Sequence, residues 1–167
     1  PVKFINKTVK DNSEIYIVNR NAAEKNSLSR LEPELSEKSD KLTFTHAIRN
    51  ADLDYSVESD RVKENIVIQS RQPSYRYRFK LRCDNLTPVF KAEQRQIKFY
   101  SENLTEVFCI PSPFMTDASG AASDGVFYEF TEGSDGIYDI SVIADSEWIN
   151  SEDRAFPVTI DPQVVIS

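Results

Sequence analysis

The sequence is poor in the residues from which most catalytic and metal sites are built. Its 167 residues include one histidine, two cysteines and four glycines. The cysteines form no Cys-x-x-Cys pair, and with a single histidine they give no credible zinc site. The chain also has no Gly-x-Ser-x-Gly elbow for a serine triad and no glycine-rich loop for a phosphate. We therefore predict no catalytic residue, no cofactor and no metal site.

Long apolar runs are absent as well. No run approaches the roughly 20 residues that span a bilayer, and no signal peptide is recognised, so we expect no membrane insertion. The chain starts at Pro1 and not at a methionine, from which we expect a piece of a larger polypeptide. Hydrophobic residues make up 40% and charged residues 28% of the chain, which are ordinary values for a globular domain.

Charge is unevenly distributed along the chain. The net charge is −7 and the isoelectric point about 4.8, which argues against a nucleic acid as the main partner. Residues 1–100 carry 19 basic and 14 acidic side chains, whereas residues 101–167 carry 13 acidic side chains and only Arg154 as a base. Either the two halves interleave and partly neutralise each other, or the second half forms an acidic face for cations or a basic partner.

An alternating pattern predicts a half-buried strand between Tyr75 and Cys83. The apolar face of this strand carries Tyr75, Tyr77, Phe79, Leu81 and Cys83, and the opposite face carries Arg76, Arg78, Lys80 and Arg82. Residues 52–57 and 62–68 predict two further strands joined as a hairpin, with Leu53 and Tyr55 facing inward. Other strands are expected near Phe4 and at residues 15–18, 42–45, 97–100, 107–110, 126–130, 137–143 and 158–160.

Helix signals are scarce. One irregular helix or loop is expected within residues 22–35, where Pro33 interrupts the helical spacing of leucines, and a single turn at residues 146–151 is capped by Asp145. Short strands separated by turn signals predict an all-β fold, an antiparallel β-sandwich-like domain with at most one or two short helices. We divide the chain into N-terminal strands with a polar segment (1–41), a β-rich core (42–162) and the start of a linker (163–167).

The basic face between Tyr75 and Cys83, together with Trp148, is the one ligand surface that the residues suggest. Arg76, Arg78, Lys80 and Arg82 suit an anionic polymer, although a solvated strand face or a protected sheet edge explains them equally well. Trp148 more often fills the edge of a core than stacks on a sugar.

Other polar residues have simpler explanations than a site. His46 lies in a strand-like run without a nucleophile motif. Asp117 and Asp124 invite a calcium loop, but turn geometry accounts for them, and we expect their replacement by alanine to change stability little. Glu64 is expected at the wet end of its strand. Cys83 and Cys109 are interpreted as buried free thiols, with a disulfide as the alternative.

Proline and aromatic positions predict how the later strands end. Pro111 and Pro113 cannot donate hydrogen bonds to a sheet, so they end the strand at residues 107–110. Phe114 and Met115 are expected where the chain crosses the core. Pro157 and Pro162 bracket a last short strand.

Three collinear segments resemble a known family. They are residues 53–57 (LDYSV) with 62–68 (VKENIVI), residues 107–118 (VFCIPSPFMTDA) with Gly120 and Ser123, and residues 148–150 (WIN) with 154–162 (RAFPVTIDP). Together they resemble the β-rich module on the N-terminal side of large bacterial YD-repeat (Rhs) and wall-associated surface proteins. In that family a similar ending leads into a DNRLRE-type domain.

The resemblance implies a non-catalytic structural or spacer module of a bacterial cell-surface or secreted repeat protein. Its partners would be neighbouring domains of the same polypeptide, with no nucleic acid, and its location extracellular, secreted or associated with the cell wall. A β-sandwich that binds cell-wall or host glycans in adhesion is the first alternative. A glycan hydrolase is the second.

Overall fold

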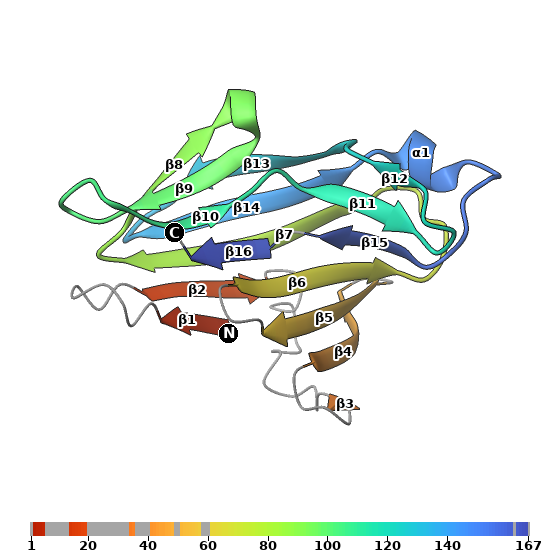
Figure 1. Cartoon of the computed structure of the whole chain (residues 1–167), viewed down its shortest axis with the longest axis horizontal. Coiled ribbons are helices and arrows are strands. Elements are labelled where there is room, and N and C mark those ends of the chain that lie inside the picture. The colour runs from red at the N-terminus through yellow and green to blue at the C-terminus, as the bar shows by residue number, and fades with distance from the viewer. Residues whose placement is uncertain are drawn as a thin grey trace.

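The computed structural model describes residues 2–5, 14–19, 34–35, 41–48, 51–57, 61–161 and 163–166. The predicted fold class is confirmed, because this part of the chain is built almost entirely of antiparallel strands with one short α-helix (Figure 1). The strands in chain order are β1 (Val2–Ile5), β2 (Glu14–Asn19), β3 (Glu34–Leu35), β4 (Lys41–Ile48), β5 (Ala51–Val57), β6 (Arg61–Ile68), β7 (Arg76–Asp84), β8 (Thr87–Lys91), β9 (Gln96–Tyr100), β10 (Glu106–Ile110), β11 (Phe114–Asp117), β12 (Ala122–Ser123), β13 (Val126–Glu132), β14 (Ile137–Ala144), β15 (Val158–Asp161) and β16 (Gln163–Ile166). The helix α1 covers Ser146–Asn150, and a 3-10 turn covers Ala92–Gln94.

The first sheet has the strand order β1-β2-β7-β14-β13. Its central strand β7 pairs with β2 on one side and with β14 on the other. The alternation predicted for β7 is confirmed: Tyr77, Phe79, Leu81 and Cys83 are buried, and the arginines between them are exposed. Because β7 lies inside the sheet, the basic residues on it do not protect an exposed edge.

The second sheet is organised around β6, which forms the predicted hairpin with β5. Along its other side β6 pairs with β15 through Ile66–Ile68 and with β16 through Arg61–Lys63. Beyond β15 and β16 lie two further short strands: β11 pairs with β15, and β10 pairs with β16. The strands β12, β9 and β8 extend the sheet from there, and β4 and β3 extend it beyond β5.

Prolines stand at both of these strand breaks. The sequence correctly predicts that strands end there, but the strand between Pro157 and Pro162 is not the last one, because β16 follows it. β10 ends before Pro111 and β11 begins after Pro113, while β15 ends before Pro162 and β16 begins after it. Proline has no N–H to donate, so a continuous ladder is interrupted where it stands. Beside β6, β15 and β16 thus follow each other along one line of the sheet, and β11 and β10 follow each other along the next line.

The two sheets share one hydrophobic core, which is what a sandwich requires. Buried side chains of the first sheet, such as Leu81 and Val126, belong to the same cluster as Ile66, Phe99 and Ile160 of the second sheet. Phe114 departs from the prediction, because its side chain is 40% exposed whereas Met115 is fully buried. The two residues are neighbours on β11, and side chains of neighbours on a strand point to opposite faces.

Turn chemistry joins β13 to β14 as predicted. The segment from Gly133 to Gly136 closes this hairpin, with positive φ at Asp135 and Gly136. A Cβ atom on Gly136 would lie 2.9 Å from the carbonyl oxygen of Cys83, so the close approach to β7 also requires glycine.

Several predictions concern segments that the structure describes little or not at all. The helix expected within residues 22–35 lies outside the described residues, apart from Glu34–Leu35, which form β3. The polar segment up to residue 41 and the linker start at 163–167 remain predictions, although β16 occupies Gln163–Ile166. In the described ranges, no helix is long and apolar enough to cross a membrane.

Candidate functional site

The four basic side chains of β7 form one face of the first sheet, which we call the basic face (Arg76, Arg78, Lys80 and Arg82). The three arginines are exposed and Lys80 is half-buried. Outward side chains on one strand follow each other every two residues, about 7 Å apart. In β14, Ser141 stands opposite Arg78 and Asp139 stands opposite Lys80. The strand therefore holds a row of basic side chains on one face of the sheet.

The members of the basic face differ in their partners. Arg76 makes two hydrogen bonds to the carboxylate of Glu129 on β13, at 2.5 and 3.0 Å, and these bonds lower the pKa of Glu129. Arg82 forms an ion pair with Asp84 at 3.1 Å. Arg78 and Lys80 form no ion pair within the described part of the chain. Carboxylates nevertheless lie beside both, because Asp139 stands opposite Lys80 and Glu129 stands in the same cross-strand row as Arg78.

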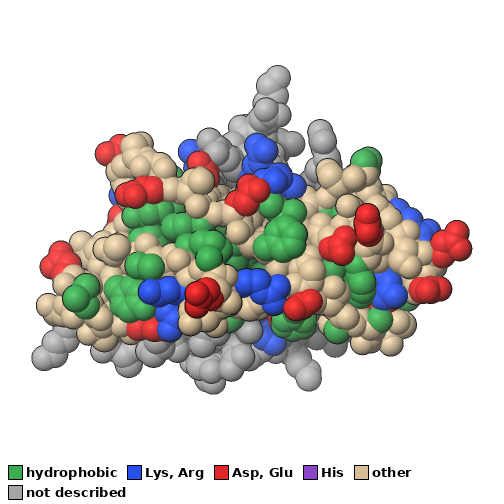
Figure 2. All heavy atoms as spheres, turned by 90° about the horizontal axis from the view of Figure 1, so that it is seen from above, with side chains coloured by type: hydrophobic (Ala, Val, Ile, Leu, Met, Phe, Trp, Pro, Cys, Tyr) green, Lys and Arg blue, Asp and Glu red, His purple; other side chains and the backbone are tan. Residues whose placement is uncertain are grey.

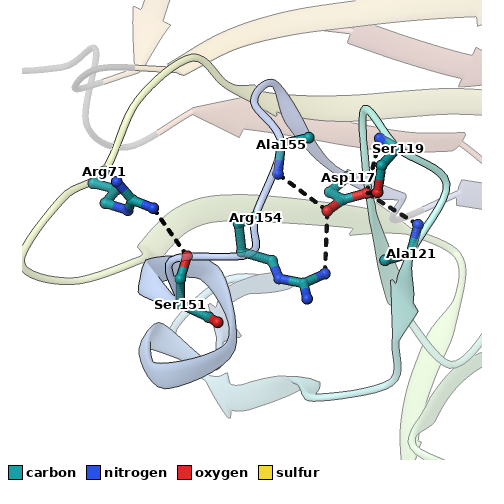
Figure 3. Close-up of polar contacts among 7 residues, drawn as sticks. All are labelled: Arg71, Asp117, Ser119, Ala121, Ser151, Arg154 and Ala155. Carbon is teal, nitrogen blue, oxygen red and sulfur yellow. Dashed lines mark hydrogen bonds and ion pairs between the residues drawn. The ribbon is translucent and has the colours of Figure 1, made fainter.

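The second polar cluster lies where β11 meets the segment between α1 and β15 (Figure 3). Asp117, at the end of β11, has a fully buried carboxylate. One oxygen accepts hydrogen bonds from the backbone N–H and hydroxyl of Ser119 and from the N–H of Ala121, at 2.6 to 3.0 Å. The other accepts from Arg154 at 3.1 Å and from the N–H of Ala155 at 3.2 Å. The carboxylate thus joins two segments that are far apart in the sequence.

These donors determine what Asp117 can do. The hydroxyl of Ser119, followed by backbone N–H groups, lowers the pKa of Asp117 to about 2 despite its burial. Both oxygens already accept hydrogen bonds from groups of the chain itself. Within the described ranges no group of three histidine, cysteine, aspartate or glutamate side chains is placed to hold a metal ion.

Trp148 lies beside this cluster and not on an open ligand surface. The guanidinium of Arg154 stacks over its ring at 4.3 Å from the centroid, and the ring packs against the core. The predicted cap of α1 is present, because Asp145 accepts hydrogen bonds from the N–H groups of Glu147 and Trp148. Arg71 donates to the carbonyl of Ser151 at 2.9 Å, which fixes the end of this helix (Figure 3).

A buried acid lies inside the second sheet. Glu64 on β6 was expected at a wet strand end, but only 7% of it is exposed. Its partner is Tyr55 on β5, whose hydroxyl donates to the carboxylate. Burial raises the pKa of Glu64 to about 7, and the hydrogen bond from Tyr55 opposes this shift. The expectation failed because Glu64 points to the same side of β6 as Ile66 and Ile68, toward the core.

The two cysteines are free thiols, whereas the single histidine is described only by its backbone. Cys83 and Cys109 are free thiols, and burial raises the pKa of both, to about 12 for Cys83. A thiol with a raised pKa is a poor nucleophile at neutral pH. The backbone of His46 belongs to β4, and its side chain lies outside the described residues.

Aromatic rings gather at the open edge of the sandwich. Phe130 stacks on Tyr138 with ring centroids 5.2 Å apart, and Phe90 of β8 lies 6.5 Å from Phe130. Figure 2 looks down on this edge and shows hydrophobic side chains gathered in a band there. Phe90 remains 36% exposed. The sequence did not single out this cluster, because β8 carries Pro88 and gave no strand signal.

The uneven charge along the sequence is partly balanced in space. Arg76–Glu129, Arg95–Asp124 and Lys98–Glu106 each join a base from residues 1–100 to an acid from residues 101–167. The strand order explains two of these pairs, since β14 lies between β7 with Arg76 and β13 with Glu129, and β9 with Lys98 pairs with β10, which carries Glu106. The interleaving hypothesis therefore accounts for the described charges better than a separate acidic face.

Comparison with known proteins gives three relatives of one kind. The chain is 29% identical over 160 residues to the tRNA(Glu)-specific nuclease WapA of Bacillus subtilis subsp. natto, covering 90% of this chain and 7% of that protein. It is 29% identical over 136 residues to tRNA nuclease WapA of Bacillus subtilis and to the tRNA3(Ser)-specific nuclease WapA of Bacillus spizizenii, covering 77% of this chain and 6% of each relative. All three are nucleases that act on tRNA. No family model and no solved structure matches the chain.

These relatives overturn the functional expectations drawn from the sequence. The resemblance to a wall-associated module that leads into a DNRLRE-type domain is wrong, because the relatives found are tRNA nucleases. The predicted non-catalytic spacer, the glycan-binding adhesion module, the glycan hydrolase and the statement that the protein is no enzyme are contradicted by the same names.

The expectation of no nucleic-acid partner is also wrong. It relied on the net charge of the whole chain, whereas binding of a polyanion responds to local charge on one surface. The extracellular location stays a prediction.

Proposed function

We propose that this chain is part of a tRNA nuclease and serves a step of tRNA cleavage that is shared by nucleases with different tRNA targets. One observation carries the proposal: the chain is 29% identical both to a tRNA(Glu)-specific and to a tRNA3(Ser)-specific nuclease. A segment that selects one tRNA by its bases needs side chains particular to that tRNA. Equal similarity to both relatives favours a role that is independent of tRNA identity.

The chain spans less than a tenth of the length of these relatives, so the activity belongs to a much larger polypeptide. The described residues of this chain form a sandwich. Its Asp117–Arg154 contact and its Glu64–Tyr55 hydrogen bond both lie inside the fold and join parts of it. The basic face of β7 remains open to solvent.

The proposal is tested with the full polypeptide that carries this chain, incubated with total tRNA and followed on denaturing gels. We expect cleavage of tRNA. Replacing Leu81, which is fully buried, by aspartate unfolds the sandwich and should abolish cleavage. No cleavage by the parent protein, or full cleavage by the Leu81→Asp variant, would contradict the proposal.

A segment exchange tests the independence from tRNA identity. Residues 51–161 are replaced by the matching segment of the tRNA(Glu)-specific relative, and the cleaved tRNA is identified by sequencing. We expect the same tRNA to be cut before and after the exchange. A change to tRNA(Glu) would show that this segment selects the target.

A further inference from the structure

The strand β13 forms one edge of the first sheet, and only its side toward β14 is paired (Figure 1). Two backbone hydrogen bonds show which of its residues bond to β14. Asp145 donates to the carbonyl of Gly125, and Gly133 donates to the carbonyl of Ile137, both at 2.8 Å. Bonded and non-bonded pairs alternate along an antiparallel ladder, so the odd-numbered residues between these two ends bond to β14.

The even-numbered residues of β13 point their backbone N–H and C=O groups away from the sheet. The N–H of Val126 bonds locally to the carbonyl of Asp124 at 2.7 Å. For Tyr128, Phe130 and Glu132, the part of the chain that the structure describes supplies no backbone partner on this side. These three residues therefore present a row of donors and acceptors with the spacing that another strand requires.

β13 lacks the features that usually protect the edge of a sheet, which are proline, lysine, a bulge or a very short strand. In the second sheet, the edge strand β8 contains Pro88 and the edge strand β12 has only two residues. β13 has seven residues without proline or lysine, and its register with β14 is continuous. It also carries Phe127, whose side chain is 48% exposed. A long, regular edge with an exposed aromatic ring is a surface to which a further strand adds.

The side chains along this edge determine which strand fits it. On the core side, Phe130 stacks on Tyr138 and lies 6.5 Å from Phe90 of β8, which is 36% exposed. These rings belong to the hydrophobic band that is visible from above (Figure 2). Successive side chains of a strand point to opposite faces, so every second side chain of an added strand would cover Phe130 and Phe90. The other side chains would lie beside Phe127. The strand that fits has apolar residues at alternate positions.

We propose that the edge of β13 binds an extended strand of the same polypeptide, which lies outside these 167 residues and has apolar side chains at alternate positions. The length of the relatives supports this occupant, because the chain covers only 6–7% of each of them. A strand on the same polypeptide is present at a high effective concentration, so backbone pairing at one edge is enough to hold it.

A second copy of the chain fits this edge less well. It would bring the carboxylates of Glu129 and Glu132 from two edges into one interface, and like charges on neighbouring strands repel. Among the described residues, Glu129 has an ion-pair partner in Arg76, whereas Glu132 has none. The inference goes beyond the proposed function and shares with it only that the chain belongs to a larger polypeptide.

Amide hydrogen exchange in the full polypeptide, resolved by residue, tests whether the edge is occupied. The N–H groups of Phe127 and Glu129 bond to β14 and should exchange slowly in any case, which verifies that β13 is folded. With a strand in place, Tyr128 and Phe130 should exchange within about tenfold of these two rates. With an empty edge, they should exchange as fast as Asp135 in the exposed turn, after correction for intrinsic rates. Fast exchange of Tyr128 and Phe130 overturns the inference.

Two variants of one exposed position provide a matched comparison. Glu132→Pro removes an N–H that points away from β14, so it leaves the ladder between β13 and β14 intact. Glu132→Ala removes the same carboxylate and keeps the N–H. We expect the exchange of Tyr128 and Phe130 to become at least about fivefold faster in Glu132→Pro, because one bond to the added strand is lost. It should be unchanged in Glu132→Ala, and equal effects of the two changes would contradict strand addition.

Photo-crosslinking identifies the occupant. A photoreactive residue replaces Thr131, which is exposed on β13, in a mixture of isotopically labelled and unlabelled full polypeptide. We expect links to a segment outside residues 1–167, each within a single labelled or a single unlabelled molecule. Links between labelled and unlabelled molecules would assign the edge to a second copy, and links only within residues 1–167 would assign it to this chain itself. Either result overturns the inference.

The outcomes also separate this inference from the proposed function. A full polypeptide that cleaves tRNA but exchanges Tyr128 and Phe130 rapidly overturns strand addition and leaves the proposed function standing. A polypeptide that protects these amides and links to its own distant segment, but cleaves no tRNA, contradicts the proposed function and supports strand addition.

Discussion

At the scale of single residues, Asp117 shows how a turn residue can carry long-range structure. The Asp-Ala-Ser-Gly segment that follows β11 is a local turn, and the carboxylate accepts from Ser119 and Ala121 within it. The same carboxylate also binds Arg154 and Ala155, which approach because β11 and β15 pair in the second sheet. One side chain thus fixes both the turn and the start of β15.

Asp117→Ala should therefore destabilise the sandwich, contrary to the expectation from turn geometry. The change removes the carboxylate that accepts hydrogen bonds from five donor groups of the chain. One of these donors is Arg154, whose side chain is only 14% exposed and would be left without its carboxylate. Breaking a buried pair in this way costs about 3–5 kcal/mol. Asp124→Ala is the control, because Asp124 is 85% exposed and its pair with Arg95 contributes at most about 1 kcal/mol. Urea unfolding measures both, and equal losses would contradict the assignment.

Glu64 predicts an unusual dependence of stability on pH. Its pKa is about 7 in the folded chain against 4.5 for the free group, so the folded state holds a proton that the unfolded state releases between these values. Stability should fall as the pH rises from about 4.5 to 7. Asp117, with its pKa lowered from 3.8 to about 2, acts in the opposite direction and loses its contribution as the pH falls below about 4.

The contributions of Glu64 and Asp117 are both fully present only near pH 4–5, so these two groups favour a maximum of stability in that range. Glu64→Gln keeps an acceptor for the Tyr55 hydroxyl but does not titrate, so it should flatten the decline between about pH 4.5 and 7. Denaturant midpoints across this range provide the measurement. An unchanged decline in the variant would rule out Glu64 as its source.

At the scale of elements, β11 shows how a one-residue difference in register decides the role of an aromatic side chain. Met115 faces the core and pairs across the sheet with Ile160, while Phe114 pairs with Asp161 and faces outward. Both are apolar, and composition alone assigns both to the core. The pairing of β11 with β15 decides which one is buried.

Met115→Ala should cost about 2–5 kcal/mol, because it leaves a cavity at a fully buried position. Phe114→Ala should cost about 1 kcal/mol or less, since its ring is already 40% exposed. Thermal unfolding of both variants on the same chain gives the comparison. A larger loss for Phe114→Ala than for Met115→Ala would mean that the register of β11 is shifted by one residue.

At the scale of the whole molecule, the two halves of the chain form one folded unit. β6 and β7 from the first half pair with β15, β16 and β14 from the second. The ion pairs that cross between the halves bring the basic and acidic segments together. Each half alone therefore leaves its central strands paired on one side only.

Fragments 1–102 and 103–167 should not fold separately, because each exposes unpaired strands and half of the core. Mixing them should restore a cooperative thermal transition, helped by the opposite net charges of the two fragments and weakened by high salt. Near-ultraviolet circular dichroism follows the association through the aromatic residues. A cooperative transition in either fragment alone would show that the halves are independent.

The sequence by itself determined the local features. The alternation in β7 predicted its register and its basic face, because opposite orientation of successive side chains is a property of the extended backbone. The positions of Pro111, Pro113 and Pro162 predicted where strands end, because proline lacks an N–H wherever it stands. The cap of α1 and the turn before β14 likewise depend on neighbours a few residues away.

The tertiary structure decided what depends on distant partners. Asp117 accepts from Arg154 and Ala155, which lie 37 and 38 residues along the chain, so turn chemistry alone could not reveal its second oxygen as bound. Glu64 is buried because β5 and the facing sheet cover it, and no local pattern records that cover. The pairing of Arg76 with Glu129 of β13 is likewise a result of folding, which brings charges from separate strands together, whereas Arg82 pairs with Asp84 two residues along the same strand.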